Sequence, residues 1–169
     1  MRKKYWLVKS EENVYSIDNL AKDKETFWDG VRNYQARNFM RDDMKLGDLV
    51  LFYHSNSTPN GIAGICEISK EGYPDHTAFD PEDKHFDPKS NESAPTWIMV
   101  NVKFIEKFNK IIELSELKSN PKLSKMRLVQ RGNRLSVMPV EKEEYEEILK
   151  MAERWNDINS SEHLLASHV

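Results

Sequence analysis

The stretch LVLFYHSNSTPNGIAGICEI, residues 49–68, decides the fold of this chain. Residues 49–53 are an uninterrupted apolar run of strand length, which predicts a strand that is buried on both faces. Residues 54–61 are polar and rich in turn-forming types, and residues 62–68 return to a mostly apolar pattern. The stretch therefore predicts a β-hairpin with a buried first strand.

The elements on either side of this hairpin are predicted from apolar periodicity and capping residues. They are strands at residues 5–8, 96–104 and 135–138, the last ended by Pro139, and helices near residues 17–20, 36–44, 114–117 and 141–152. Because these strands are few, short and joined by helices, they predict an α+β, mostly β fold. Its expected form is a small mixed β pseudobarrel flanked by helices.

Residues 70–96 interrupt this pattern with four prolines among acidic residues. A loop of this length inside a compact domain is usually functional, and the aromatic residues spaced along it are expected to pack it against the body. In the strand at residues 96–104, alternation places Trp97 on the more polar face. There its ring is either offered to a ligand or covered by the long loop.

The chain of 169 residues is long enough for one domain with a hydrophobic core. That domain is expected over residues 1–155, with Trp155 on the apolar stripe of the last helix. Residues 156–169 lose all periodicity and are expected to be a flexible C-terminal tail. No apolar run approaches the roughly 20 residues of a membrane span, and no secretion signal is visible, so a cytoplasmic location is expected, or a nuclear one in a eukaryote.

Sequence patterns for catalysis and metal binding are not found. Cys66 is the only cysteine, so no intramolecular disulfide can form, and the five histidines lack the spacings of a zinc site. There is no nucleophile elbow or Walker loop, and the acids Asp42 and Asp43 are adjacent, so they would diverge on a helix. The sequence therefore predicts a protein that is not an enzyme and has no metal or cofactor.

Charge is unevenly distributed along the chain. The formal net charge of −3 argues against indiscriminate binding to polyanions. Residues 71–92 are strongly acidic, whereas residues 122–134 contain five basic side chains and no acid. The basic segment is either ordinary solvated surface or one basic face, and Arg127, Arg131 and Arg134 are its candidate phosphate-binding residues.

The segment FWDGVRNYQARNFMR, residues 27–41, combines flat rings, amides and guanidinium groups. Trp28 and Tyr34 can stack on a base, the amides can read its hydrogen-bonding edge, and the arginines can hold a phosphate. An ordinary structural interpretation is also open, because aromatic residues at the start of an amphipathic helix often anchor the core, and Asn33 or Asn38 can cap a helix. The mixture suits a nucleic acid better than a metabolite.

The segment WDGVRNYQARN, residues 28–38, resembles the signature of the EVE-domain family. The resemblance continues in order through Gly47-Asp48, Phe52-Tyr53-His54-Ser55, Tyr73-Pro74-Asp75, Asp87-Pro88-Lys89-Ser90, Pro95-Thr96-Trp97 and Arg134-Leu135-Ser136-Val137-Met138-Pro139-Val140. The family is related to the YTH and PUA domains, so the resemblance implies the PUA-like fold. It also implies a pocket that receives a single base, in many cases a modified cytosine in DNA, without catalysis on that base.

Carried over position by position, the resemblance implies a base-binding pocket. Its members are Trp28, Asn33, Tyr34, Gln35, Ala36, Arg37, Asn38, Tyr53, His54, Ser55, Trp97, Ser136, Met138 and Pro139. The expected function is a non-enzymatic nucleic-acid-binding module that recognises a single modified base, with modified cytosine in DNA favoured.

Two alternatives to this function stay open at the level of sequence. One is a reader of a modified RNA base, and the other is a protein that binds a free nucleoside or another small molecule. No coiled-coil heptad or obvious dimer surface is present in the sequence, so the default expectation is a monomer that does not associate with membranes.

Overall fold

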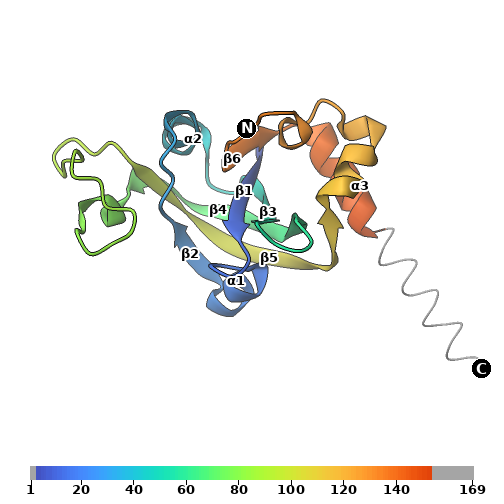
Figure 1. Cartoon of the computed structure of the whole chain (residues 1–169), viewed down its shortest axis with the longest axis horizontal. Helices are drawn as coiled ribbons and strands as arrows, with labels where there is room; N and C mark the ends of the chain where they lie inside the picture. Colours follow the sequence, from blue (N-terminus) through green and yellow to red (C-terminus); the bar gives the residue numbers. More distant parts are fainter. Residues whose placement is uncertain (1–2, 154–169) are drawn as a thin grey trace, which may run out of the picture.

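The computed structural model describes residues 3–153 and shows a curved mixed sheet flanked by short helices (Figure 1). The strands within these residues are β1 (Tyr5–Glu11), β2 (Glu25–Trp28), β3 (Leu49–Ser55), β4 (Gly61–Pro74), β5 (Ile98–Glu113) and β6 (Val137–Val140). The helices are α1 (Ile17–Asp23), α2 (Tyr34–Asn38), α3 (Leu114–Ser119) and residues 142–153, with a π-helical turn at Phe39–Asp43 and 3-10 turns at His76–Phe79, Pro121–Leu123 and Arg127–Val129. The predicted fold class is confirmed.

The six strands of the described region form one sheet in the order β2-β5-β4-β3-β1-β6. The predicted hairpin is present, because β3 and β4 pair antiparallel from Leu49 opposite Glu67 to His54 opposite Gly61. Within residues 3–153, β1 and β3 are the one parallel pair. Register shifts between β4 and β5 bend the sheet, as bulges do in small barrels.

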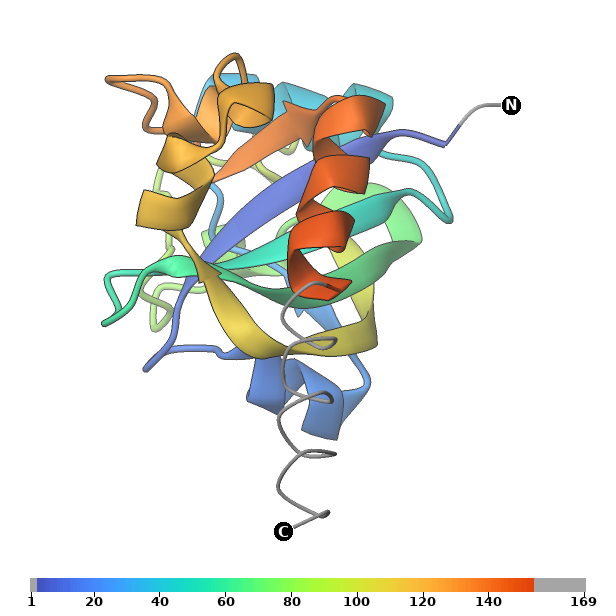
Figure 2. The ribbon, with the colours of Figure 1, turned by 90° about the vertical axis from the view of Figure 1, so that its right-hand side faces the viewer.

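The sheet is packed on both faces, as the apolar run at residues 49–53 predicted. Val50 and Phe52 belong to a cluster that contains Trp6 and the buried residues of α1 and α2. Leu51 and Tyr53 belong to a second cluster on the opposite face. The helix at residues 142–153 lies across this second face (Figure 2), where it contributes Tyr145 and Ile148 to the core.

Three parts of the sheet differ from the prediction. β4 and β5 extend well beyond the predicted residues 62–68 and 96–104, and β2 was not predicted because four residues are too few to show a period. β2 forms by pairing with β5, where Trp28 lies opposite Val100. The predicted loop at residues 70–96 therefore begins only after Pro74, and it projects from one end of the sheet (Figure 1).

Trp97 takes the second of its two expected positions. It directly precedes β5, is only 7% exposed, and its indole Nε1 donates a hydrogen bond to Asp87 Oδ2 at 2.7 Å. The next residue on the same face, Met99, is also buried, so this face of β5 is not polar at its start. The long loop thus covers Trp97 instead of leaving it exposed.

The predicted end of the last strand at Pro139 was wrong. Pro139 lies inside β6, opposite Trp6 of β1. β6 is an edge strand of the sheet, and an edge strand tolerates a residue without an N–H on its outer side.

The predictions for Trp155 and for residues 156–169 fall outside the described residues. None of the helices within residues 3–153 is long and apolar enough to cross a membrane.

Asp48 ties the start of the hairpin to the first strand. Its carboxylate is 3% exposed and accepts hydrogen bonds from the Trp6 indole Nε1 at 3.0 Å, the Lys4 backbone N at 3.1 Å and the Lys45 backbone N at 3.0 Å. One short side chain thereby satisfies donors from β1 and from the turn before β3.

Replacing Asp48 by alanine is expected to lower the free energy of unfolding by about 3 kcal/mol, because buried donors lose their acceptor. Urea unfolding at neutral pH measures this change. Glu92→Ala, at an exposed position of the long loop, is the control and is expected to change stability by less than about 0.5 kcal/mol. Equal stabilities of the two variants would contradict the role given to Asp48.

Candidate functional site

A cavity of about 900 Å³ lies where the ends of β1 and β2 meet the long loop. Its wall is formed by residues 9–11, 14–15, 26–31, 55, 83–85 and 136. Ligand-binding cavities in proteins commonly have volumes of about 300–1,000 Å³, so this one is large enough for a nucleotide base.

Three aromatic rings line this cavity. Trp28 is 8% exposed and makes edge contacts with Phe52 and Tyr15, at ring-centroid distances of 5.5 and 6.4 Å. The Tyr15 hydroxyl donates a hydrogen bond to Asp23, and burial together with this carboxylate raises the pKa of Tyr15 to about 12. Phe27 is 44% exposed, and its ring makes an edge contact with His76 at a centroid distance of 5.1 Å.

Lys9 belongs to the same wall. Its backbone N–H donates to the Ser136 carbonyl, which fixes the segment before β6 against β1. Its ammonium lies 5.8 Å from the centre of the Tyr53 ring, and partial burial lowers the pKa of Lys9. Within residues 3–153, no carboxylate lies within ion-pair distance of this ammonium.

Asp75 holds together the segments that form one side of the cavity. Its side chain is fully buried and accepts hydrogen bonds from the Gly30 backbone N at 2.8 Å, from Arg32 Nη1 at 2.9 Å, and from the backbone and hydroxyl of Thr77. Its own N–H donates to the Trp97 carbonyl. Burial alone would raise the pKa of Asp75, but the hydrogen bonds from Thr77, Gly30 and Arg32 outweigh it and lower the pKa.

Arg32 extends this network into the long loop. Its Nη2 and Nε donate to the His85 carbonyl at 2.7 and 3.2 Å. The His85 ring lies directly over Gly30, so that a Cβ atom added at Gly30 would lie 2.6 Å from the imidazole. Gly30 also has a φ of +79°, which favours glycine. The loop is therefore packed closely against the end of β2.

Three of the sequence-predicted base-binding residues reach the cavity wall. They are Trp28, Ser55 and Ser136, which come from β2, from the end of β3 and from the segment before β6. The structure thus brings together residues that are widely separated in the chain.

Other predicted members lie on α2, beside the cavity. Asn33 Oδ1 accepts a hydrogen bond from the Ala36 backbone N at 3.0 Å and caps the helix, and Ala36 is fully buried in the core. Gln35 and Asn38 are exposed, and Asn38 Oδ1 accepts a hydrogen bond from Arg37 Nε at 2.9 Å. Base contacts by these residues stay predictions.

Tyr34, Arg37 and Trp97, together with Arg32, form a column of tilted rings and guanidinium groups. The rings of Tyr34 and Trp97 are 5.0 Å apart, Arg37 lies 5.1 Å from the Tyr34 ring, and Arg32 lies 5.4 Å from the Trp97 ring. Arg37 Nη1 also donates to the Thr96 carbonyl at 2.7 Å. Tyr34 is 61% exposed and Trp97 is 7% exposed, so the column is accessible at its Tyr34 end.

The remaining predicted base-binding residues serve the core in this structure. Tyr53 and Met138 belong to the second cluster, and Pro139 lies in β6. His54 is 3% exposed, its Nε2 accepts a hydrogen bond from the Ile17 backbone N, and burial lowers its pKa. A direct contact of these four residues with a base stays a prediction.

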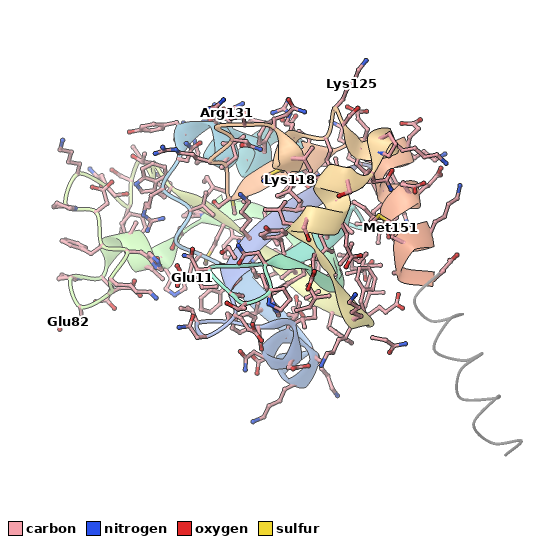
Figure 3. All side chains as sticks on the ribbon, turned by 45° about the vertical axis from the view of Figure 1, so that its right-hand side comes forward. Glu11, Glu82, Lys118, Lys125, Arg131 and Met151 are labelled. Atoms are coloured by element: carbon pink, nitrogen blue, oxygen red, sulfur yellow. The ribbon has the colours of Figure 1, made fainter. Side chains whose placement is uncertain are left out.

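The three predicted phosphate-binding arginines follow α3. Arg127 lies over the Phe39 ring at 5.7 Å, which connects the basic segment to the turn after α2. Arg131 and Arg134 are exposed. Arg131 and Lys125 project along the upper edge of the molecule (Figure 3), the edge where α2 also lies in Figure 1.

The polar residues of the wall were not predicted from the sequence, among them Lys9, Glu11, Asp29 and His85. Asp29 directly follows Trp28 in the family signature, so its position in the motif was an available signal. The others look like ordinary solvated charges in the sequence, because only the fold brings them to the cavity.

The fold and the cavity define this chain as a PUA-like pseudobarrel with a ligand-sized cavity at one end of the sheet. The chain belongs to the EVE domain family, which matches residues 4–151. It is 44% identical to thymocyte nuclear protein 1 of Homo sapiens over an alignment 169 positions long. The alignment covers 89% of this chain and 74% of that protein.

Solved structures share this fold over most of their length. A hypothetical protein from Leishmania major is 49% identical with a TM-score of 0.87, covering 92% of this chain and 98% of that one. The human THYN1 protein, solved in complex with DNA containing 5-methylcytosine, is 44% identical with a TM-score of 0.83, covering 89% and 98%.

Asp75→Asn is expected to lower the free energy of unfolding by about 3 kcal/mol at neutral pH, because it breaks a buried ion pair. The pKa of Asp75 is lower in the folded protein than its ordinary value of 3.8, so the unfolded chain binds the proton more readily. The contribution of this carboxylate to stability is therefore complete above about pH 3.8 and is lost as the pH falls through the lower folded value.

Thermal unfolding measured from about pH 2 to pH 7 tests this prediction. The Asp75→Asn variant should lose less stability on acidification than the wild type, whereas Glu92→Gln should follow the wild-type profile. Identical acid profiles of all three proteins would refute the assignment.

Gly30→Ala is expected to destabilise the fold by about 1–3 kcal/mol and to displace His85 from the cavity wall. Gly47→Ala is the matched control, since Gly47 has a similar φ of +84° but no atom within 4 Å of the added Cβ. Chemical unfolding measures the loss of stability in each variant. The positive φ strains the alanine at both positions, and only the alanine at position 30 also clashes with the His85 ring. Equal losses at both positions would show that the contact with His85 is unimportant.

Proposed function

We propose that this protein binds DNA that contains a modified cytosine, and that a single base enters the cavity between β1, β2 and the long loop. The observation that carries the proposal is the close similarity to the human THYN1 protein solved with 5-methylcytosine-containing DNA, with a TM-score of 0.83. 5-Methylcytosine is accordingly the favoured ligand. The proposal is recognition without a chemical step on the base.

Contacts in the cavity have to offset the free-energy cost of extruding a base from the DNA. Turning a base out of its stack costs a few kcal/mol, and stacking on an aromatic ring returns about 1–3 kcal/mol. Tyr15, Phe27 and Trp28 are the aromatic residues of the cavity wall that can serve this purpose. Burial of a methyl group adds roughly 0.8 kcal/mol. Hydrogen bonds to the edge of the base must therefore supply much of the selectivity.

Two surfaces beside the cavity are proposed to contact the rest of the strand. The column of Tyr34, Arg37 and Trp97 is suited to a nucleotide next to the inserted base, because it combines an exposed aromatic edge with a guanidinium group. Arg131 and Arg134, with Arg127 behind them, are suited to backbone phosphates. A cytoplasmic or nuclear location is compatible with this proposal and stays a prediction.

Binding of the purified protein to matched oligonucleotides tests the function. The panel contains single- and double-stranded DNA and RNA with one cytosine, 5-methylcytosine, 5-hydroxymethylcytosine or N6-methyladenine, plus the free nucleosides. Selective binding of DNA with a modified cytosine is the expected result. Preference for a modified RNA, or binding of free nucleosides only, would replace the proposal with the corresponding alternative.

Removing two arginines is expected to flatten the salt dependence of DNA binding. Each phosphate contact contributes about 0.9 to the slope of log K against log salt concentration, so Arg131→Ala with Arg134→Ala should reduce that slope by roughly 1.8. Lys118→Ala with Lys150→Ala removes the same charge from exposed positions on α3 and the last helix and should leave the slope unchanged. An unaltered slope in the arginine variant would rule out these phosphate contacts.

A further inference from the structure

One carboxylate in the cavity wall is not used by any hydrogen bond. Three acidic residues line the cavity. Glu11 accepts from Asn56 Nδ2 at 2.7 Å, and Asp83 accepts from the His85 backbone N at 2.8 Å. Asp29 accepts no hydrogen bond from any residue in the range 3–153, and the one basic group of these residues within ion-pair distance of it is His85 Nδ1, 3.6 Å from Oδ2.

The backbone on both sides of Asp29 is fixed. Trp28, before it, pairs with Val100 in the sheet, and Gly30, after it, donates its N–H to the buried carboxylate of Asp75. The His85 ring packs on Gly30 and lies against Asp29, which restricts the directions in which the carboxylate can turn. The Asp29 side chain remains 29% exposed, so a ligand in the cavity can reach it.

A reader of 5-methylcytosine in DNA must reject thymine, and a methyl-binding surface cannot do this. Both bases carry the same methyl group at C5. They differ at C4, where cytosine has an amino group that donates hydrogen bonds and thymine has an oxygen that accepts them, and at N3. A carboxylate is the side chain that accepts from the cytosine amino group and repels the thymine oxygen.

We infer that Asp29 is the residue that selects cytosine over thymine, by accepting a hydrogen bond from the exocyclic amino group of the inserted base. This inference rests on the proposed function and adds the chemical basis of its specificity. C5 is bonded to C4, so the methyl group falls on the same side of the cavity as Asp29, where Trp28 and Val31 provide apolar surface. A site that hydrogen-bonds a polar substituent of its ligand binds an analogue without that substituent much more weakly.

Competition binding with two DNA duplexes tests the inference. The duplexes are identical except for one central pair, 5-methylcytosine with guanine or thymine with adenine. The cost of extruding each base is the same for every protein variant, so a change in the affinity ratio reports only on the protein. The wild type should prefer 5-methylcytosine by roughly tenfold or more.

Asp29→Asn should lose most of this preference, because its amide can donate to the thymine oxygen. Asp29→Ala should weaken binding to 5-methylcytosine without a gain for thymine. Glu82→Gln is the charge-matched control: Glu82 lies at the far tip of the long loop (Figure 3), and its loss should leave the ratio unchanged. An unchanged ratio in both Asp29 variants would overturn the inference.

A modified ligand gives a second test that needs no variant. In single-stranded DNA no base pair has to be broken, and N4,N4-dimethyl-5-methylcytosine has no hydrogen on its amino group, so the wild type should bind it no better than thymine in the same strand. Retained preference for the dimethylated base would overturn the role of Asp29 alone. A wild type that does not distinguish 5-methylcytosine from cytosine would overturn the proposed function as well.

Discussion

The buried carboxylate of Asp75 is the interaction on which the candidate site depends. It is fully shielded from solvent, and a buried charge is tolerated only when partners compensate it. Gly30, Arg32 and Thr77 supply the donors, and the Asp75 N–H reaches the carbonyl of Trp97. Segments that are more than forty residues apart in sequence thereby become one wall. Removing one partner would leave the others buried and unpaired.

The proposed binding of DNA depends on local groups and not on the overall charge of the protein. The net charge of −3 provides no general attraction for a polyanion. The cavity wall combines aromatic and polar residues with Lys9 and Lys84, and further cationic groups lie outside it, on α2 and on the segment after α3. In the proposed binding mode, the surface arginines hold the strand while the cavity receives one base.

Much of the fold could be predicted from the sequence, because the hairpin, the capped helix α1 and the last helix each have a local pattern. Ser16 caps α1, because its hydroxyl accepts a hydrogen bond from the Asn19 backbone N. β2 could not be predicted, since its four residues pair only when β5 is in place. Of the predicted base-binding residues, Trp28, Ser55 and Ser136 reach the cavity. Lys9 and His85 could not be found, since tertiary packing alone brings them there.

The central claim is that a base occupies the cavity fixed by Asp75, and an NMR titration tests it most directly. Amide and indole resonances are followed while a DNA duplex with one 5-methylcytosine is added. The account predicts the largest shifts at Trp28, Asp29 and Gly30, at Ser55 and along residues 83–85. Shifts confined to α3 and the last helix, with the cavity resonances unmoved in a protein that binds the DNA, would contradict it.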